Sequence, residues 1–211
     1  VYEEKNMSLT RDNSKVQEAI FSSLFPKHPY GTQTVLGTQE NLKNPSITNI
    51  KNYYKQWYVP NNMAICMSGD LDPDATIALI DKYFGGLKPN PELPKLDLPK
   101  EAPITQPVVK EVLGPDAESV ALAWRFPGVS DKDFEILQVV SQVLYNGKAG
   151  LIDLDLNQQQ KVLNSYGYPM GLADYSAVLL GGLPKQGLTV EEVKDLLLSA
   201  IKKLRAGQID E

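Results

Sequence analysis

Two residue types that often carry chemistry are nearly missing from this chain, which has one cysteine, Cys66, and one histidine, His28. A single cysteine excludes a disulfide within the chain. Cys66 lies in the apolar run "MAICM", where a small buried side chain is expected rather than a reactive thiol. A single histidine, without serine or cysteine at a motif spacing, excludes a catalytic triad. We therefore interpret His28 as a structural loop residue.

A basic surplus is missing too, because 21 Lys and Arg stand against 26 Asp and Glu, giving a net charge of −5. Such a chain does not neutralise a phosphate backbone, so no nucleic-acid partner is expected. No apolar run approaches the length of about 20 residues that crosses a bilayer, so no membrane segment is expected in this chain. The glycines form neither G-x-G-x-x-G nor a phosphate loop, which removes the basis for nucleotide binding.

What the chain does have is the composition of a folded globular protein, with 42% hydrophobic and 22% charged residues. Prolines gather between 89 and 115, at positions 89, 91, 94, 99, 103, 107 and 115. Proline interrupts helices and central strands and keeps a linker extended. The sequence therefore predicts a first unit over 1–88, a proline-rich linker over 89–106 and a second unit over 107–211.

The first unit shows helix signals and one strand signal. "VYEEKNMSL" is typical of a helix end, and three further helices are predicted at 12–25, 46–57 and 72–84, with caps at Asp12 or Asn13, Ser46 and Asp72. "MAICM" predicts a strand buried on both faces, with Cys66 inaccessible. The aromatic residues near 53–58 have helical spacing, which favours hydrophobic core over a stacking platform.

The second unit alternates strands and helices. Strands are predicted at "VVKEVL", "SVALAWRF", "KVLNSYGYPM" and "YSAVLLGGL". Helices are predicted at 130–145 and from the capping box of Thr189 and Glu192 to Gly207. The segment 151–160 fits either a strand or a short helix. We predict an α+β fold of two similar-sized units, each a mainly antiparallel sheet with helices packed on one face.

The segment "DLDLNQ" matches the start of a calcium loop but not the rest of it. Asp153, Asp155 and Asn157 match its first positions, but Gln158 replaces the glycine and Asn164 replaces the final glutamate. Asp153 and Asp155 are therefore predicted to face solvent.

Taken in order, segments of the first 87 residues resemble one family. The succession is "VYEE", "HPYG", "LGT", a helix ending in "WY", "PNNM" opening a strand that ends in "GD", and a helix ending in "YFG". It is similar to the pitrilysin/insulinase family of zinc metallopeptidases, in the bacterial branch related to mitochondrial processing peptidase. The match is close over 1–87 and loose over 107–211. The resemblance implies that the two units are homologous domains of the family, both truncated in this sequence.

The resemblance implies a zinc site completed outside this sequence. In the family, two histidines of an inverted H-x-x-E-H helix and a later glutamate bind zinc, and the motif's own glutamate is the general base. That helix is absent here, so no catalytic residue is assigned within the chain. "VYEE" matches the later glutamate at Glu4, whereas Glu3 points about 100° away on the same helix. Zinc is expected in the full-length protein and not in this chain alone.

The second unit has no histidine in the corresponding helix, "DKDFEILQVVSQVLY", and resembles the family's non-catalytic domain. We interpret the chain as an internal fragment of a zinc endopeptidase; the alternative is a non-catalytic paralogue or partner subunit that binds substrate without zinc. The family implies a peptide substrate added as a strand to a sheet edge. A partner subunit, or the second half of the same chain, would close the chamber.

Overall fold

The computed structural model describes residues 1–209, which form two compact units. One unit comprises 1–7 and 33–100, and the other comprises 8–32 and 101 onward. These packing units differ from the predicted division, because 8–32 belong with the second unit. The assignment of 1–88 and 107–211 to homologous domains stays a prediction.

The second unit is built on a three-stranded antiparallel sheet of order β1-β3-β2, from Val120–Pro127 (β1), Asn164–Gly171 (β2) and Tyr175–Leu183 (β3). Leu122 pairs with Leu180 and Gly167 pairs with the same Leu180 on its other side. The predicted strands "SVALAWRF", "KVLNSYGYPM" and "YSAVLLGGL" are thereby confirmed. The central strand β3 is buried along almost its whole length, so both faces of the sheet need a cover.

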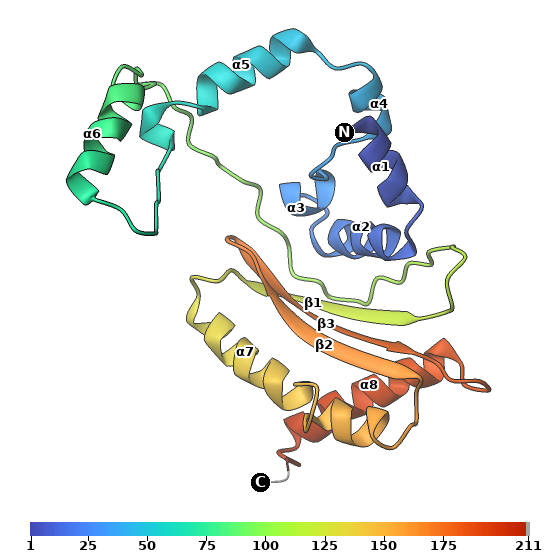
Figure 1. The fold of residues 1–211 in the computed structure, drawn as a ribbon. Coiled ribbons are helices and arrows are strands. Elements are labelled where there is room, and N and C mark those ends of the chain that lie inside the picture. The colour runs from blue at the N-terminus through green and yellow to red at the C-terminus, as the bar shows by residue number, and fades with distance from the viewer. Residues whose placement is uncertain (210–211) are drawn as a thin grey trace. The chain divides into compact units, whose positions relative to one another are not determined.

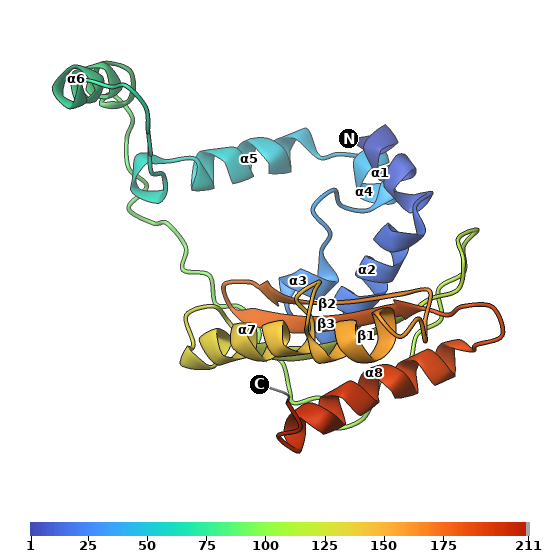
Figure 2. The same ribbon diagram turned by 60° about the horizontal axis from the view of Figure 1, so that its bottom comes forward.

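Helices α7 (Lys132–Leu144) and α8 (Val190–Arg205) cover one face, as Figures 1 and 2 show. Side chains alternate along β1, so Leu122, Trp124 and Phe126 turn to this side. They pack on a core whose fully buried members include Ile152, Leu156, Leu180, Val193 and Leu197. A π-helix at Asp153–Asn157 closes the end of this layer, which settles the ambiguity over 151–160 in favour of a short helix.

The opposite face is covered by α2 (Asp12–Leu24) and the short α3 (Pro29–Thr32). Leu24 and Phe25 pack against Ala177 and Leu179 of β3, and Ala123 of β1 lies beside them. Small alanines on this face let the helix and its aromatic residues approach the strands closely. The α+β class is confirmed. Within 107–211 the helices α7 and α8 pack on one face of the sheet, as predicted, and the other face is covered by α2 and α3, which precede that stretch in the sequence.

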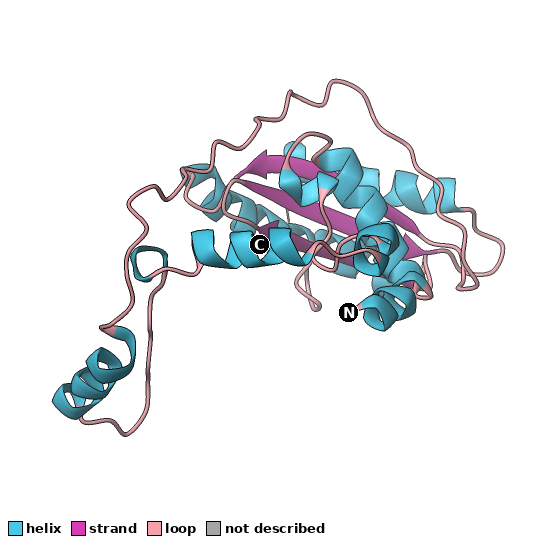
Figure 3. Cartoon of the chain, turned by 90° about the horizontal axis from the view of Figure 1, so that it is seen from above, coloured by secondary structure: helices cyan, strands magenta, loops and turns pink. Residues whose placement is uncertain are grey.

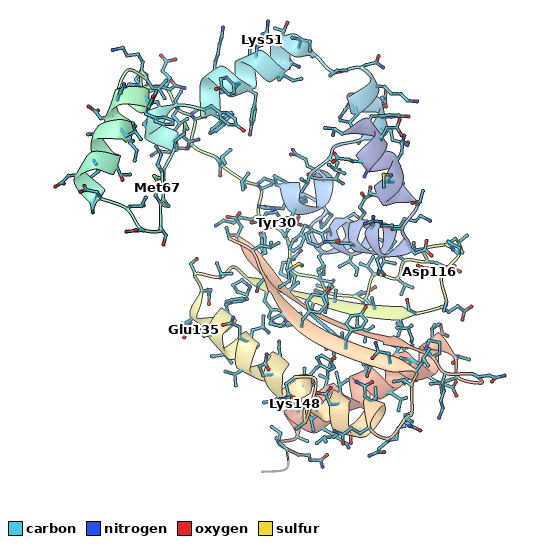
Figure 4. The ribbon with its side chains drawn as sticks, viewed as in Figure 1. Tyr30, Lys51, Met67, Asp116, Glu135 and Lys148 are labelled. Atoms are coloured by element: carbon cyan, nitrogen blue, oxygen red, sulfur yellow. The ribbon has the colours of Figure 1, made fainter. Side chains whose placement is uncertain are left out.

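The first unit contains helices and no strand among its described residues. Its elements are α1 (Tyr2–Leu9, whose last two residues fall in the second unit), α4 (Gln39–Lys43), α5 (Ile47–Trp57), a 3-10 turn (Pro60–Asn62) and α6 (Pro73–Phe84). The "MAICM" run is extended but unpaired, and Met67 lies on it with no strand beside it (Figure 4). Cys66 is exposed, so the predicted buried strand and inaccessible thiol are corrected.

The cause is the lack of a partner within residues 1–209. A strand is stabilised by ladder hydrogen bonds to a neighbour, whereas a helix closes its own. The same lack leaves the predicted aromatic core uncovered, since Tyr53, Tyr54 and Tyr58 are all more than half exposed.

Residues 85–119 contain neither helix nor strand and appear as a continuous loop in Figure 3. The division of the chain by a linker over 89–106 stays a prediction. The predicted strand "VVKEVL" is wrong, since it lies within this loop.

Helix caps follow the sequence closely. Ser46, Asp72 and Thr189 each accept a hydrogen bond from a backbone N–H in the first turn, and Thr189 with Glu192 forms the full capping box. The predicted cap of α2 is wrong, because Arg11 occupies the N-cap without a side-chain bond. Asp12 instead accepts from the N–H of Asp116, 104 residues away.

Candidate functional site

Glu4, the predicted zinc ligand, lies in the first turn of α1. Its side chain is 68% exposed. Glu3 is exposed on the same turn. An exposed carboxylate is free to bind a group supplied from elsewhere.

The described residues do not bring together a zinc site around Glu4. No three His, Cys, Asp or Glu side chains within 1–209 are close enough to hold a metal ion. One carboxylate is a single ligand, whereas a catalytic zinc takes three from the protein. The chain by itself therefore does not fit zinc, and Glu4 could contribute only one ligand to a site assembled with other residues.

His28, the only histidine, is in the second unit and its ring is 1% exposed. Its Nδ1 accepts a hydrogen bond from the backbone N–H of Tyr30 at 3.2 Å. In the neutral ring the proton is then on Nε2, which is 3.6 Å from Asp174 and has no hydrogen-bond partner among the described residues. Tyr30 donates from its hydroxyl to the same carboxylate at 3.1 Å. His28 is thus a packed loop residue, as expected.

Beside His28 lies a buried carboxylate that the sequence did not single out. Glu101 has a side chain only 1% exposed, and its Oε1 accepts the backbone N–H groups of Lys27 and His28, both at 2.7 Å. The backbone N–H of Glu101 donates to the hydroxyl of Tyr175 at 2.8 Å. Glu101 of the linker therefore holds the loop that follows α2 in place through hydrogen bonds.

Arg125 of β1 is the cation of this cluster, with a side chain 8% exposed. One guanidinium nitrogen lies 3.8 Å from Glu101 and donates to the carbonyl of Leu24, while the other donates to the carbonyl of Ala102. The guanidinium also lies over the ring of Tyr175, 5.6 Å from its centre. A cavity of about 320 Å³ opens next to this pair, lined mainly by residues 101–106, with Ser23 at the end of α2 and Pro26 and Lys27 of the following loop.

A second buried carboxylate, that of Asp153, contradicts the predicted solvent exposure of this residue. Asp153 is 4% exposed, not solvent-facing, and one of its oxygens accepts the backbone N–H groups of Asn146, Gly147 and Gly150. Asp155 is half-buried and pairs with Lys203 of α8 at 2.6 Å. Both carboxylates are used within the fold, so neither is available to a metal.

The acidic groups at helix starts are also engaged. The backbone hydrogen bond from Asp116 lowers the pKa of Asp12, with a smaller contribution from Lys15. Backbone and hydroxyl hydrogen bonds from Thr189 lower the pKa of Glu192. On the edge strand β2, burial raises the pKa of Tyr166, and neighbouring Tyr168 adds to the rise. These shifts belong to structural contacts and not to a reaction centre.

The described residues form an α+β module in which buried polar side chains bond to the backbone. They do not form a complete reaction centre. The family model for the "Peptidase M16 inactive domain" matches residues 46–211, about four-fifths of the chain. The chain therefore belongs to the M16 peptidase family, which confirms the resemblance to pitrilysin and insulinase. The matched region begins at the cap of α5, and so includes part of the first unit.

Two relatives show the extent of the likeness. The zinc protease PqqE of Helicobacter pylori is 26% identical over 196 residues, covering 90% of this chain and 43% of that protein. The crystal structure of a protease from Helicobacter pylori aligns with a TM-score of 0.82 and 24% identity, covering all of this chain and 52% of that one.

The structure of pitrilysin aligns with a TM-score of 0.64 and 19% identity over 99% of this chain and 23% of its own. The two structural matches show the fold. The chain spans about half the length of the relatives from Helicobacter pylori. No helix within residues 1–209 is long and apolar enough to cross a membrane.

Proposed function

We propose that the protein is part of a zinc-dependent endopeptidase that hydrolyses peptides or unfolded protein segments with a metal-activated water. The observation that carries the proposal is the family match over 46–211, together with a carboxylate at Glu4 that is exposed on the helix where the family has its third zinc ligand. In this proposal Glu4 is the third ligand, and the two histidines and the general base come from residues outside this sequence.

The second unit would then serve as the non-catalytic domain. Its sheet-facing helix α7 carries no histidine, and the family description of the matched region as inactive supports this role. The peptide substrate would bind as an added strand on a sheet edge, where main-chain hydrogen bonds supply much of the affinity. The remaining wall of the chamber would come from the second half of the same chain or from a partner subunit.

A non-catalytic paralogue is the second candidate. The description of the matched region as an inactive domain favours it. Such a protein would bind an extended peptide without hydrolysing it. The presence of H-x-x-E-H in the protein upstream of Val1 would separate the two candidates.

The decisive experiment compares Glu4→Gln with Glu3→Gln in the intact natural protein. Glutamine keeps the size of Glu4 but loses the negative charge, so zinc affinity and peptide hydrolysis should fall together by more than about a hundredfold, since losing an outer-shell partner alone costs 10–100-fold. Glu3 points about 100° away, and its variant should remain within about twofold of wild type. The neighbouring variant controls for general damage to α1.

Three results would count against the proposal. If both variants keep zinc and activity, Glu4 is a surface charge. If Glu3→Gln alone is impaired, the ligand is its neighbour. If the intact wild type binds no zinc, measured by metal analysis and calorimetry, the paralogue candidate stands.

A further inference from the structure

The buried ion pair in the second unit does more than join two charges. Glu101 and Arg125 together satisfy four main-chain groups from separate parts of the chain: the N–H groups of Lys27 and His28 and the carbonyls of Leu24 and Ala102. We propose that Glu101 and Arg125 are positioning residues that lock the segment 24–32 onto the sheet, and that peptide hydrolysis by the intact protein depends on this lock. The activity part of the inference rests on the proposed function.

The lock acts where regular structure cannot supply partners. Leu24 ends α2, and the last carbonyls of a helix have no partner within it. Pro26 then prevents the helix from continuing, which leaves the N–H groups of Lys27 and His28 outside any ladder. A carboxylate takes the two donors and a guanidinium takes the helix-end carbonyl. These hydrogen bonds therefore form only when the backbone follows one particular course at this turn.

Buried charge pairs are a poor choice for stability alone. Removing two charges from water costs several kcal/mol per ion, and apolar replacements are often as stable. What such a pair supplies is a single allowed arrangement, because any displacement of 24–32 leaves a buried charge without its partners. Tyr175 strengthens this constraint, because it accepts from the N–H of Glu101 and its ring lies under Arg125.

The order of the segments along the chain is the reason to expect that the lock affects peptide hydrolysis. Segment 8–32 lies in the sequence between the two stretches of the first unit, 1–7 and 33–100. Only Thr10 and Arg11 separate α1, which carries Glu4, from α2. The last two residues of α1 belong to the second unit, so the segment held on the sheet by Glu101 and Arg125 directly follows the helix that carries Glu4. A displacement of about 1 Å at a reacting centre can cost about a hundredfold in rate.

The first arm of the test measures the lock itself in the 211-residue chain. Arg125→Met should speed hydrogen exchange of the Lys27 and His28 amides about tenfold or more and expose the Lys27–His28 bond to trypsin. Arg125→Lys keeps the charge but lacks the second donor arm, so its effect should be smaller. Glu101→Gln keeps an acceptor oxygen and should also be intermediate. Unchanged protection in Arg125→Met would overturn the lock.

The matched control is Lys203→Met, which breaks the 2.6 Å pair with Asp155 on the other face of the same sheet. It should leave exchange at Lys27 and His28 unchanged. If the control loosens these amides as much as Arg125→Met does, the effect is general destabilisation and the lock is refuted. Should Arg125→Met fail to fold, Arg125→Lys and Glu101→Gln carry the same comparison with the control.

The second arm measures kcat and KM for peptide hydrolysis by the intact protein. Arg125→Met should lower kcat about tenfold while KM changes less than about threefold, Arg125→Lys should recover part of the loss, and Lys203→Met should match wild type. If the wild type is active and a variant with faster exchange at Lys27 and His28 keeps the wild-type kcat, only the positioning role is refuted. An inactive wild type overturns the proposed function and the positioning role with it, while the lock is still judged by exchange.

Discussion

Helices α6 and α7 carry equivalent local signals but have different surroundings. Each has an aspartate N-cap whose side chain accepts from a backbone N–H, and each has an apolar face. α7 buries Leu137 and Leu144 against the sheet, whereas no residue of α6 is buried and Ile77 is 63% exposed. Caps and periodicity are therefore enough to specify a helix, but they do not determine whether its apolar face is covered.

The same contrast separates the two units as wholes. The second unit has a continuous core on both faces of its sheet, while the first exposes large apolar side chains on α5, α6 and the extended run between them. Contiguous exposed apolar surface of this kind marks an interaction site or an uncovered core face. Four predictions, from the largest expected effect to the smallest, test this contrast.

The largest difference is expected in thiol reactivity. Cys66 is exposed in the first unit, so it should react with a neutral thiol reagent within about tenfold of the rate of the unfolded chain. A buried thiol for comparison comes from Ser141→Cys, made in a Cys66→Ser background. Ser141 is 3% exposed in the second unit and its hydroxyl has no hydrogen-bond partner among the described residues.

The thiol introduced at position 141 reacts only when the second unit opens, so it should be slower than Cys66 by at least about a hundredfold. Equal rates, followed by mass spectrometry under native conditions, would remove the distinction between the units. Protection of Cys66 would restore the buried strand predicted from the sequence.

The next effect is on the free energy of unfolding. Leu197 is 0% exposed in the second core, and Leu197→Ala should cost about 2–5 kcal/mol in urea denaturation. Ile50 is 56% exposed on α5, and Ile50→Ala should change stability by less than about 0.5 kcal/mol. Leu163→Ala, at a 69% exposed position of the second unit, controls for residue size. A large loss at Ile50 would mean that α5 is covered in solution.

How much of this fold could be read from the sequence depends on whether the signal is local. The longer helices and most of their caps follow from capping residues and 3.6-residue periodicity, which act within a few residues. The short α3 and α4 are not among the predicted helices. The three paired strands were found because β-rich runs coincided with available neighbours. "MAICM" and "VVKEVL" carry similar strand signals yet have no partner strand, and pairing is not encoded by the segment alone.

The site shows the same limit. Glu4 was identified by resemblance and is placed on a helix as expected, but its role as a ligand stays a prediction. The Glu101–Arg125 pair was missed, because its partners are up to 101 residues apart in sequence. A signal was present in "ALAWRF", where an arginine stands at an inward position of an otherwise small and apolar strand. The predicted exposure of Asp153 is wrong because its partners are the backbone N–H groups of residues 146–150, and no side-chain motif marks such partners.

The third prediction concerns that buried aspartate. Asp153→Ala should lose about 3 kcal/mol, because three backbone N–H groups lose a charged acceptor. Asp155→Ala breaks one half-exposed pair and should cost about 1 kcal/mol or less. Urea denaturation monitored by circular dichroism compares the two neighbours within one short segment. Similar losses would show that the loop 146–150 is held by other contacts.

The smallest effect should appear in the dependence of stability on pH at the capping box of α8. The backbone N–H of Thr189, followed by its hydroxyl, lowers the folded-state pKa of Glu192. A carboxyl with a depressed folded pKa stabilises the fold at pH values above its unfolded pKa, and this contribution disappears as the pH falls through the folded value. Stability supplied by Glu192 should therefore be complete at pH 7 and decline below about pH 4.3, the ordinary value for glutamate.

Glu192→Gln keeps an acceptor for the cap but cannot titrate, so its urea midpoint should start slightly lower at pH 7 and fall less steeply from pH 5 to pH 3. Glu191→Gln changes the same helix turn without removing the capping box, and it should keep the wild-type slope. Because α8 packs on the sheet, the change should appear in the unfolding of the whole second unit.

The corresponding loss of a cap in the first unit, Asp72→Ala, should only unwind α6, whose apolar face is not covered. If Asp72→Ala instead lowers the main unfolding transition, the two units share one cooperative core and the contrast between them does not hold.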